Sequence, residues 1–378
     1  MERFSKNDII SLVEHAPRYD LAESYGPNLR LADVMSASDW SGFGELPLAY
    51  GTPQGELRLR QAIADLHGVT ADEVVVTVGG MHALFLLAFI LCDRGDEAVV
   101  TAPLFPPARA ALDAVGACVR TVNLTFSRGY QLDLDELHEQ LSKRTKLVSF
   151  ASPQNPSGVA IPMKTIAGIL ALMAEICPQA HLLVDETYRE AAYGNAPTSA
   201  SAVTLGPRIV AVASLSKCHG APGLRLGWAI TRDPALREQL VLGKFNTVAS
   251  CSPMDEALAL KVFEQRDRIV GDRREQLAAG LAMTARWVAE NGDLVDWIRP
   301  DAGALCCARL KPAVFDDAAV ARFYAVLTEL DVRVGNGLWF GEEARIFRLG
   351  FGLLPLPDFD AALRAVTSAL RQAARVAA

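Results

Sequence analysis

Apolar and polar residues along the chain fall into blocks with the lengths of strands and helices. Between residues 55 and 235, short β-branched or apolar runs recur, separated by segments with helical spacing. The expected strands are residues 73–78, 98–102, 118–124, 146–151, 181–186 and 208–215, and the helices between them include 57–67, 81–92 and 108–115. Strands that alternate with helices predict an α/β fold with a mainly parallel sheet and right-handed crossovers.

The pattern changes after residue 235. Long, charge-rich helical stretches come first, and short strands then mix with helices up to the C-terminus, which is typical of a smaller α+β domain. We therefore expect a large domain over residues 46–275 and a small C-terminal domain over residues 276–378. Residues 1–45 are expected to be an N-terminal segment that joins the small domain.

Composition narrows the class of protein. The chain has 378 residues, of which 51% are hydrophobic and 21% charged, and such a chain can bury enough apolar surface to fold. A net charge of −7 without a basic block argues against nucleic-acid binding. The longest apolar stretch, 81–92, is shorter than the roughly 20 residues of a membrane span, and the start of the chain has no signal-peptide core. We expect a cytoplasmic protein with no nucleic-acid or membrane partner.

Cysteines and histidines give no sign of a metal or disulfide site. The seven cysteines are an odd number and form no CxxC pair, and the six histidines are scattered. A disulfide framework is not expected in a chain of this size, and no zinc-ligand spacing is present, so we expect no metal.

The strongest chemical signal is the segment SLSKCHGAPGLRLGW, residues 214–228, which follows an apolar strand. A lysine at the end of a buried strand loses part of its hydration, and Lys217 could then act as a nucleophile that forms a Schiff base. Ser214 and Arg225 in the same segment are natural phosphate ligands. A solvated lysine in a surface turn is the alternative for this segment taken alone.

Two further segments place polar residues after expected strands. Asp185 ends the run HLLVDE with Tyr188 three residues later, and Asn155 lies between two prolines in SPQNPSG. Ligand clefts of α/β proteins form at the carboxyl ends of parallel strands, so these side chains are candidates for one cleft. The alternatives are a helix N-cap for Asp185 and a simple Asn-Pro turn for Asn155.

An anion-binding turn is expected in VTVGGMHAL, residues 76–84, which runs from a strand through two glycines into a helix. The start of that helix would offer free backbone N–H groups and a favourable dipole to a phosphate. The glycines do not match GxGxxG and no acidic residue follows at the right distance, so a dinucleotide is not expected.

In this order, the motifs resemble those of the class I and II aminotransferases, which are fold-type I enzymes dependent on pyridoxal 5'-phosphate (PLP). The resemblance covers nearly the whole chain and implies a large domain around a mainly parallel sheet, a smaller α+β domain, and PLP as the cofactor. The segments that carry it are YGTPQGELRLR (50–60), PLFPP (103–107), SPQNPSG (152–158), VDETY (184–188), SLSK with PGLRLGW (214–228), GNGLWFG (335–341) and FRLGFG (347–352).

The resemblance gives each candidate a role at the cofactor. Lys217 would form the aldimine with PLP and then move a proton on the substrate, and Asp185 would pair with the pyridine nitrogen. Tyr188 and Asn155 would hydrogen-bond the phenolic oxygen. Phe105 would stack on the ring, unless it is an ordinary core residue. The expected phosphate ligands are Gly80, Met81, Ser214 and Arg225, with Ser216 as a further candidate.

The resemblance also concerns the substrate and the assembly. Arg348 would bind the substrate α-carboxylate, and Tyr50 would reach the phosphate of a neighbouring subunit, which implies a homodimer with shared active sites. The segment DLAESYGP, residues 20–27, replaces the usual glycine-rich substrate loop and puts Glu23, Ser24 and Tyr25 near the side-chain pocket. This loop is similar to that of an atypical branch with capreomycidine-synthase-like cyclases and arginine oxidases. Glu23 would pair with a cationic side chain there, or be a solvated loop residue.

The expected function is transfer of the amino group of an L-α-amino acid to a 2-oxo acid. A second interpretation keeps PLP and Lys217 but leads to cyclisation, elimination or oxidation of arginine or a similar basic amino acid. The same residues serve both reactions, so the motifs do not separate them. A PLP-binding regulator is disfavoured because no basic helix-turn-helix precedes the motif that begins at Tyr50.

Overall fold

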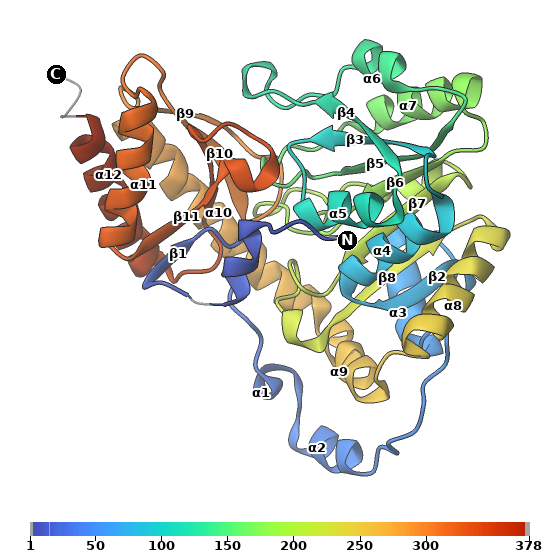
Figure 1. Ribbon diagram of the computed structural model, residues 1–378. Coiled ribbons are helices and arrows are strands. Elements are labelled where there is room, and N and C mark those ends of the chain that lie inside the picture. The colour runs from blue at the N-terminus through green and yellow to red at the C-terminus, as the bar shows by residue number, and fades with distance from the viewer. Residues whose placement is uncertain (1–2, 15, 375–378) are drawn as a thin grey trace.

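The computed structural model describes residues 3–14 and 16–374, which fold around two separate sheets (Figure 1). The larger sheet has seven strands in the order β2-β8-β7-β6-β5-β3-β4. Its strands are β2 (Val74–Val78), β3 (Glu97–Ala102), β4 (Cys118–Asn123), β5 (Thr145–Ala151), β6 (His181–Asp185), β7 (Ile209–Ser214) and β8 (Leu226–Thr231).

The pairing in this sheet confirms the mainly parallel arrangement expected from the sequence. Strands β4, β3, β5, β6 and β7 pair in parallel, whereas β8 is antiparallel to both β2 and β7. Strand β8 was not expected as a strand, because its sequence LGWAIT was interpreted as the end of the lysine segment, although the turn residues Gly220, Pro222 and Gly223 precede it. Every residue of β7 is buried, as expected for a strand that is covered on both faces.

Helices cover both faces of the larger sheet and create two apolar clusters. One cluster joins the sheet to α4, α5 and α8, and the other joins it to α3, α7 and α9. The helices of this part are α3 (Leu57–His67), α4 (Gly79–Leu91), α5 (Pro106–Val115), α6 (Leu134–Gln140), α7 (Met163–Ile176), α8 (Pro234–Val248) and α9 (Pro253–Glu264). Because helices bury both faces of the sheet, the sequences of its strands are nearly continuous apolar runs.

The smaller sheet has five strands in the order β1-β11-β12-β10-β9, with β1 parallel to β11 and the other pairs antiparallel. Residues of three helices, α10, α11 and α12, form the third apolar cluster with this sheet. The elements are β1 (Tyr19–Leu21), β9 (Val295–Ile298), β10 (Leu305–Leu310), β11 (Val332–Asn336), β12 (Ile346–Gly350), α11 (Asp317–Glu329) and α12 (Leu356–Ala374). Helix α10 (Arg266–Glu290) runs from the larger part to the smaller one (Figure 1).

The N-terminal segment contacts both parts of the molecule. Strand β1 pairs with β11 in the smaller sheet. Helices α1 (Leu31–Val34) and α2 (Ala37–Gly44) lie below the larger part in Figure 1, and the Asp39 carboxylate pairs with Lys261 of α9 at 2.8 Å. Short 3-10 turns occur at Asp8–Val13, Ala71–Glu73, Phe126–Arg128, Ala202–Leu205, Pro222–Leu224 and Gly337–Phe340. Within the described ranges, no helix has the length and apolar character that crossing a bilayer requires.

Candidate active site

The polar residues predicted from the strand ends meet at one edge of the larger sheet. Asp185 is the last residue of β6 and Ser214 the last of β7, while Asn155 lies in the loop that follows β5. The register pairs Asp185 with Ala151 of β5 on one side and with Val212 of β7 on the other. The carboxyl ends of these parallel strands therefore lie together, as the position of a ligand cleft in this kind of sheet requires.

Lys217 lies just beyond this edge, three residues after the end of β7. Burial lowers the pKa of Lys217 to about 8, against the opposing effect of the Glu23 carboxylate. The Lys217 Nζ atom lies 4.9 Å from the centre of the Tyr25 ring. An amine with such a pKa is partly unprotonated near neutral pH, which is the state in which a lysine attacks a carbonyl carbon.

Asp185 is oriented by its neighbour Thr187. The backbone N–H of Thr187 donates to Asp185 Oδ1 at 3.0 Å, and the Thr187 hydroxyl donates to the same oxygen at 2.5 Å. Burial raises the pKa of Asp185, and the two hydrogen bonds act in the opposite direction. Because both bonds end on Oδ1, the second oxygen remains available for a cationic group.

Arg348 of β12 brings the smaller part of the molecule into the site. Its Nη1 donates to Asn155 Oδ1 at 2.8 Å and its Nε donates to the carbonyl of Ala22 at 3.0 Å. The guanidinium carbon lies 4.6 Å from the centre of the Phe340 ring. Burial lowers the pKa of Arg348, yet a guanidinium remains charged in proteins and presents a fork that fits a carboxylate.

The start of α4 forms the expected anion-binding turn. Gly79 has a φ of +71°, which favours glycine, and a Cβ built there would lie 2.7 Å from Arg225 Nη2. A Cβ on Gly80 would lie 3.8 Å from the Cβ of Ser214. The helix start, the Arg225 guanidinium and the Ser214 hydroxyl thus surround one point. Met81 is about half exposed and offers this point its backbone N–H.

The N-terminal segment covers the site from the side of the smaller sheet. The Tyr188 hydroxyl donates to Ser24 Oγ at 2.9 Å. Glu23 is buried, with 7% of its surface exposed, and its carboxylate affects the pKa values of Lys217 and Tyr25. A Cβ on Gly350 of β12 would collide with the Glu23 carbonyl, so the backbone of this segment lies directly against β12. The solvated position considered for Glu23 is not what the structure has.

Two predicted residues are less closely tied to this cluster. The Tyr50 side chain is 90% exposed. Phe105 precedes α5 and packs, partly buried, against the apolar cluster under α4 and α5. The backbone N–H of the preceding residue, Leu104, donates to the Phe340 carbonyl at 3.1 Å, so the Phe105 loop lies beside the Arg348 region.

Sequence reasoning missed two residues that shape the site, Thr187 and Gly227, and named a third, Ser24, without its contact. Thr187 lies inside VDETY, where a hydroxyl two residues from an aspartate is a known local hydrogen-bonding pattern and could have been a signal. Ser24 was grouped with the substrate loop without a partner. Gly227 had no signal, although a Cβ there would lie 2.5 Å from Gly80 N, because β8 passes closely behind the turn at the start of α4.

Comparison with known proteins identifies the family. The family model "Aminotransferase class I and II" matches residues 28–366, which is most of the chain. The chain belongs to this family. The resemblance inferred from the ordered motifs is therefore confirmed, as is the fold-type I architecture with its two α/β parts.

Several proteins are similar to this aminotransferase-family chain over about half of its length or more. Capreomycidine synthase of Streptomyces vinaceus is 30% identical over 326 residues, 86% of this chain and 82% of the relative. Arginine–pyruvate transaminase AruH of Pseudomonas aeruginosa is 32% identical over 191 residues, 48% of this chain and 47% of the relative. The crystal structure of the PLP-dependent cyclase OrfR superposes with a TM-score of 0.86 at 26% identity and covers 98% of each chain.

The cofactor of this aminotransferase-family enzyme is PLP, as predicted. The residues present fit it: a lysine with a lowered pKa, a carboxylate with one free oxygen, and an anion-binding turn lie around one edge of the sheet. Phosphate would be held by the start of α4 with Ser214 and Arg225. Across residues 3–14 and 16–374, no group of three or more His, Cys, Asp or Glu side chains is arranged to hold a metal ion.

Proposed function

We propose that this enzyme transfers the amino group of a basic L-α-amino acid, such as arginine, to a 2-oxo acid. The observation that carries the proposal is the buried Glu23 carboxylate, which acts on Lys217 and lies on the segment that covers Arg348. The proposal is also supported by the similarity to an arginine–pyruvate transaminase.

In this proposal, each residue of the site has a separate role in binding the substrate, holding PLP or moving a proton. Arg348 would bind the α-carboxylate, and Asn155, which accepts a hydrogen bond from Arg348, would help to hold it and would also contact the phenolic oxygen of the ring. Bound PLP would supply an electron sink for the charge that remains at the substrate Cα when its proton leaves. Lys217 would hold PLP, and its Nζ would take the Cα proton and return it one position further along. Asp185 would pair with the pyridine nitrogen, and the Tyr188 hydroxyl, which donates to Ser24 Oγ in this structure, would instead donate to the phenolic oxygen.

Glu23 provides the preference for a cationic side chain. In the part of the chain that the structure describes, its carboxylate takes part in no ion pair, although several cations lie nearby. A buried carboxylate without a partner is costly, and a guanidinium or ammonium group on the substrate would satisfy it. The neighbouring Tyr25 ring offers the same cation an aromatic face.

A second candidate is cyclisation of such a basic amino acid. It is favoured by the similarity to a capreomycidine synthase and to a PLP-dependent cyclase, each over most of the chain. Loss of the Cα proton is common to both reactions, so Lys217, Asp185 and Arg348 serve either outcome.

The two candidates differ in what they consume. Arginine, lysine, alanine and leucine would each be offered with and without pyruvate or 2-oxoglutarate, and all products would be identified by mass spectrometry. An aminotransferase consumes one 2-oxo acid and forms one new amino acid for each donor used. A cyclase converts its substrate without the 2-oxo acid, and a lack of reaction with any basic amino acid would contradict both candidates.

We further propose that the enzyme is a homodimer with shared sites. Helices α4 and α8 lie side by side, and the segment that carries Tyr50 is joined to the turn after α8 by a 3.2 Å hydrogen bond from Gly51 N to Ser250 Oγ. Large apolar side chains on these elements are exposed, namely Leu48, Tyr50, Met81, Phe89, Leu242, Phe245 and Val248. Such a face is typical of a protein interface.

Light scattering on the eluting protein tests the homodimer, since a mass near 41 kDa would indicate a monomer. Replacing Phe89 and Phe245 by glutamate should produce monomers if the α4–α8 face is the interface. We also propose a cytoplasmic location, which is supported by seven cysteines that are all free thiols.

A further inference from the structure

Thr187 holds Asp185 more closely than any other described residue does. Its hydroxyl and its backbone N–H both donate to Asp185 Oδ1, at 2.5 Å and 3.0 Å. Two donors on one oxygen favour the ionised carboxylate and restrict its rotation. Thr187 therefore determines which Asp185 oxygen can face the pyridine nitrogen. It does so without having to contact the cofactor itself.

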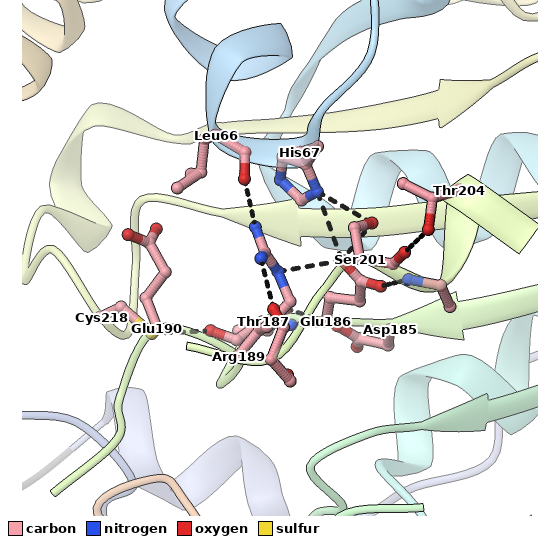
Figure 2. Close-up of polar contacts among 12 residues, drawn as sticks. Leu66, His67, Asp185, Glu186, Thr187, Arg189, Glu190, Ser201, Thr204 and Cys218 are labelled. Carbon is pink, nitrogen blue, oxygen red and sulfur yellow. Dashed lines mark hydrogen bonds and ion pairs between the residues drawn. The ribbon is translucent and has the colours of Figure 1, made fainter. Parts of the chain in front are cut away.

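The turn that carries Thr187 is anchored by the residue before it. Figure 2 shows the Glu186 side chain pointing away from Asp185 into a buried polar network. Its carboxylate accepts hydrogen bonds from Ser201 Oγ at 2.8 Å and from Ala202 N at 2.6 Å, and lies 3.2 Å from Arg189 Nε. Burial acts to raise the pKa of Glu186, but hydrogen bonding to His67 and the charge of Arg189 bring it below its ordinary value. Glu186 is thus a fixed anion whose charge Arg189 balances.

His67 completes this network as a neutral ring. Trp228 Nε1, which is a donor only, donates to His67 Nε2 at 3.1 Å, so the ring proton must be on Nδ1. His67 Nδ1 lies 3.2 Å from Ser201 Oγ and 3.3 Å from Glu186 Oε2. Burial lowers the pKa of His67, which agrees with the neutral form. Glu186 is therefore held by a neutral ring, and the charge in this network that lies near Asp185 is that of Glu186 itself, which acts to raise the pKa of Asp185.

A further contact ties Thr187 to the lysine segment. The Cys218 thiol donates to the Thr187 carbonyl at 3.1 Å, as Figure 2 shows. Cys218 directly follows Lys217, and burial raises the pKa of this thiol to about 12, so it remains a donor at neutral pH. Thr187 consequently links the turn after β6 to the turn after β7, and the two groups that contact the cofactor are held relative to each other through it.

We propose that Thr187 is a positioning residue that fixes one oxygen of Asp185 and thereby presents the other, ionised, to the pyridine nitrogen of PLP. Glu186, with His67, Ser201 and Arg189, anchors the turn in which Thr187 does this. The inference rests on the proposed role of Asp185. It adds a role for the Thr187 hydroxyl, whose removal should weaken PLP binding even in the absence of substrate.

The test is the change of Thr187 to valine, which keeps the shape and the backbone donor but removes the hydroxyl. PLP affinity of the cofactor-free protein should fall about tenfold to a hundredfold, by analogy with the loss of residues that orient the ligands of a metal ion. The pH midpoint of the bound cofactor's absorbance change should move upward. Weaker pairing with Asp185 would leave less positive charge on the pyridine ring, and the nitrogen that joins Lys217 to PLP would then keep its proton to a higher pH. Thr187→Ser restores the hydroxyl and should restore both values.

Thr145→Val is the matched control. Thr145 is buried at the start of β5, at the opposite edge of the sheet, where its hydroxyl accepts a hydrogen bond from Ser142 N at 3.0 Å. This variant should lower thermal stability but leave PLP affinity and the absorbance midpoint unchanged. Equal losses of PLP affinity in Thr145→Val and Thr187→Val would overturn the proposal, because the effect would then be general.

A double-mutant cycle separates this inference from the proposed site. In an Asp185→Asn background, Thr187→Val should weaken PLP binding no further, since the hydroxyl acts through the carboxylate. An unchanged affinity and midpoint in Thr187→Val, while Asp185→Asn alters both, would overturn the role of Thr187 alone. An Asp185→Asn variant with wild-type affinity and midpoint would overturn the role of Asp185 and the inference with it.

Discussion

The cofactor side and the substrate side of the site are built in different ways. Asp185 and Ser214 end neighbouring strands of one hydrogen-bonded sheet, and their relative positions follow from its register. Arg348 and Glu23 come from β12 and the N-terminal segment, and their positions depend on contacts between residues far apart in sequence. The hydrogen bond from Arg348 to the Ala22 carbonyl, for example, joins residues 326 positions apart.

This difference predicts how each side responds to change. A site on sheet ends is rigid, so altering it affects the chemistry that every substrate shares. A site assembled from a terminal segment and a second domain adapts more readily, and altering it changes which substrate is preferred. Variants of the cofactor side should therefore change the spectrum of bound PLP, and a variant of the substrate side that keeps the charge, such as Arg348→Lys, should leave that spectrum intact.

The largest effect is expected for Lys217→Ala. Without the amine, no group remains to bind PLP covalently and to move the substrate proton, so turnover should be lost for every amino donor. The phosphate turn at Gly80 and Arg225 is untouched, so the protein should still bind PLP non-covalently. Borohydride reduction of the wild type followed by peptide mapping should locate the cofactor on Lys217, and a label on another lysine would contradict the assignment.

Asp185→Asn should have the next largest effect. A neutral amide cannot stabilise a protonated pyridine nitrogen, and loss of such electrostatic stabilisation commonly costs on the order of 10²–10³ in kcat. The loss should be similar for basic and neutral donors, because the ring is common to both. Single-turnover rates with two donors measure this. Near-wild-type rates would mean that Asp185 is a structural carboxylate and that the cofactor side is not rigidly specified.

On the substrate side, Arg348→Lys should lower kcat/KM about a hundredfold for all donors. Lysine keeps the charge but loses the fork that binds a carboxylate through two hydrogen bonds and also reaches Asn155. The spectrum and affinity of bound PLP should stay close to wild type. A changed spectrum without substrate would show that the two sides are coupled more strongly than their separate construction suggests.

The same division explains how much the sequence could predict. The strands with apolar runs and the helices between them were placed within a few residues, because burial on both faces imposes a continuous apolar pattern. Strand β8 was missed because its residues were assigned to the lysine motif, although Gly220, Pro222 and Gly223 separate it from Lys217. The site candidates Lys217, Asp185 and Asn155 could be expected at one edge of the sheet, because their positions follow from strand ends and local motifs.

Contacts between residues that are far apart in the sequence could not be predicted from such local patterns. The bond between Tyr188 and Ser24 joins residues 164 positions apart, and the burial of Glu23 depends on how closely Gly350 lets the segment approach β12. The sequence suggested no role for His219, which directly follows Cys218. In the structure its Nε2 lies 3.3 Å from Glu190 Oε2, and the other Glu190 oxygen pairs with Arg266. No local pattern links these positions, so only the packed chain brings them together.

The smallest and most selective effect is expected for Glu23→Gln. The amide keeps the size of the side chain and removes the charge, so a cationic substrate loses its partner while a neutral substrate loses nothing. Truncating one partner of a buried charge pair costs roughly 2–5 kcal/mol, and a change to the amide, which can still accept a hydrogen bond, should lie near the low end. We therefore expect kcat/KM for arginine to fall about thirtyfold while that for leucine hardly changes. Asp20→Asn is the matched control, because Asp20 is equally buried in the same segment but already pairs with Arg333 at 2.5 Å. It should reduce stability without changing the ratio of the two kcat/KM values. An equal loss on both donors in Glu23→Gln would mean that Glu23 holds the segment in place, and the preference for a basic substrate would then have to come from elsewhere.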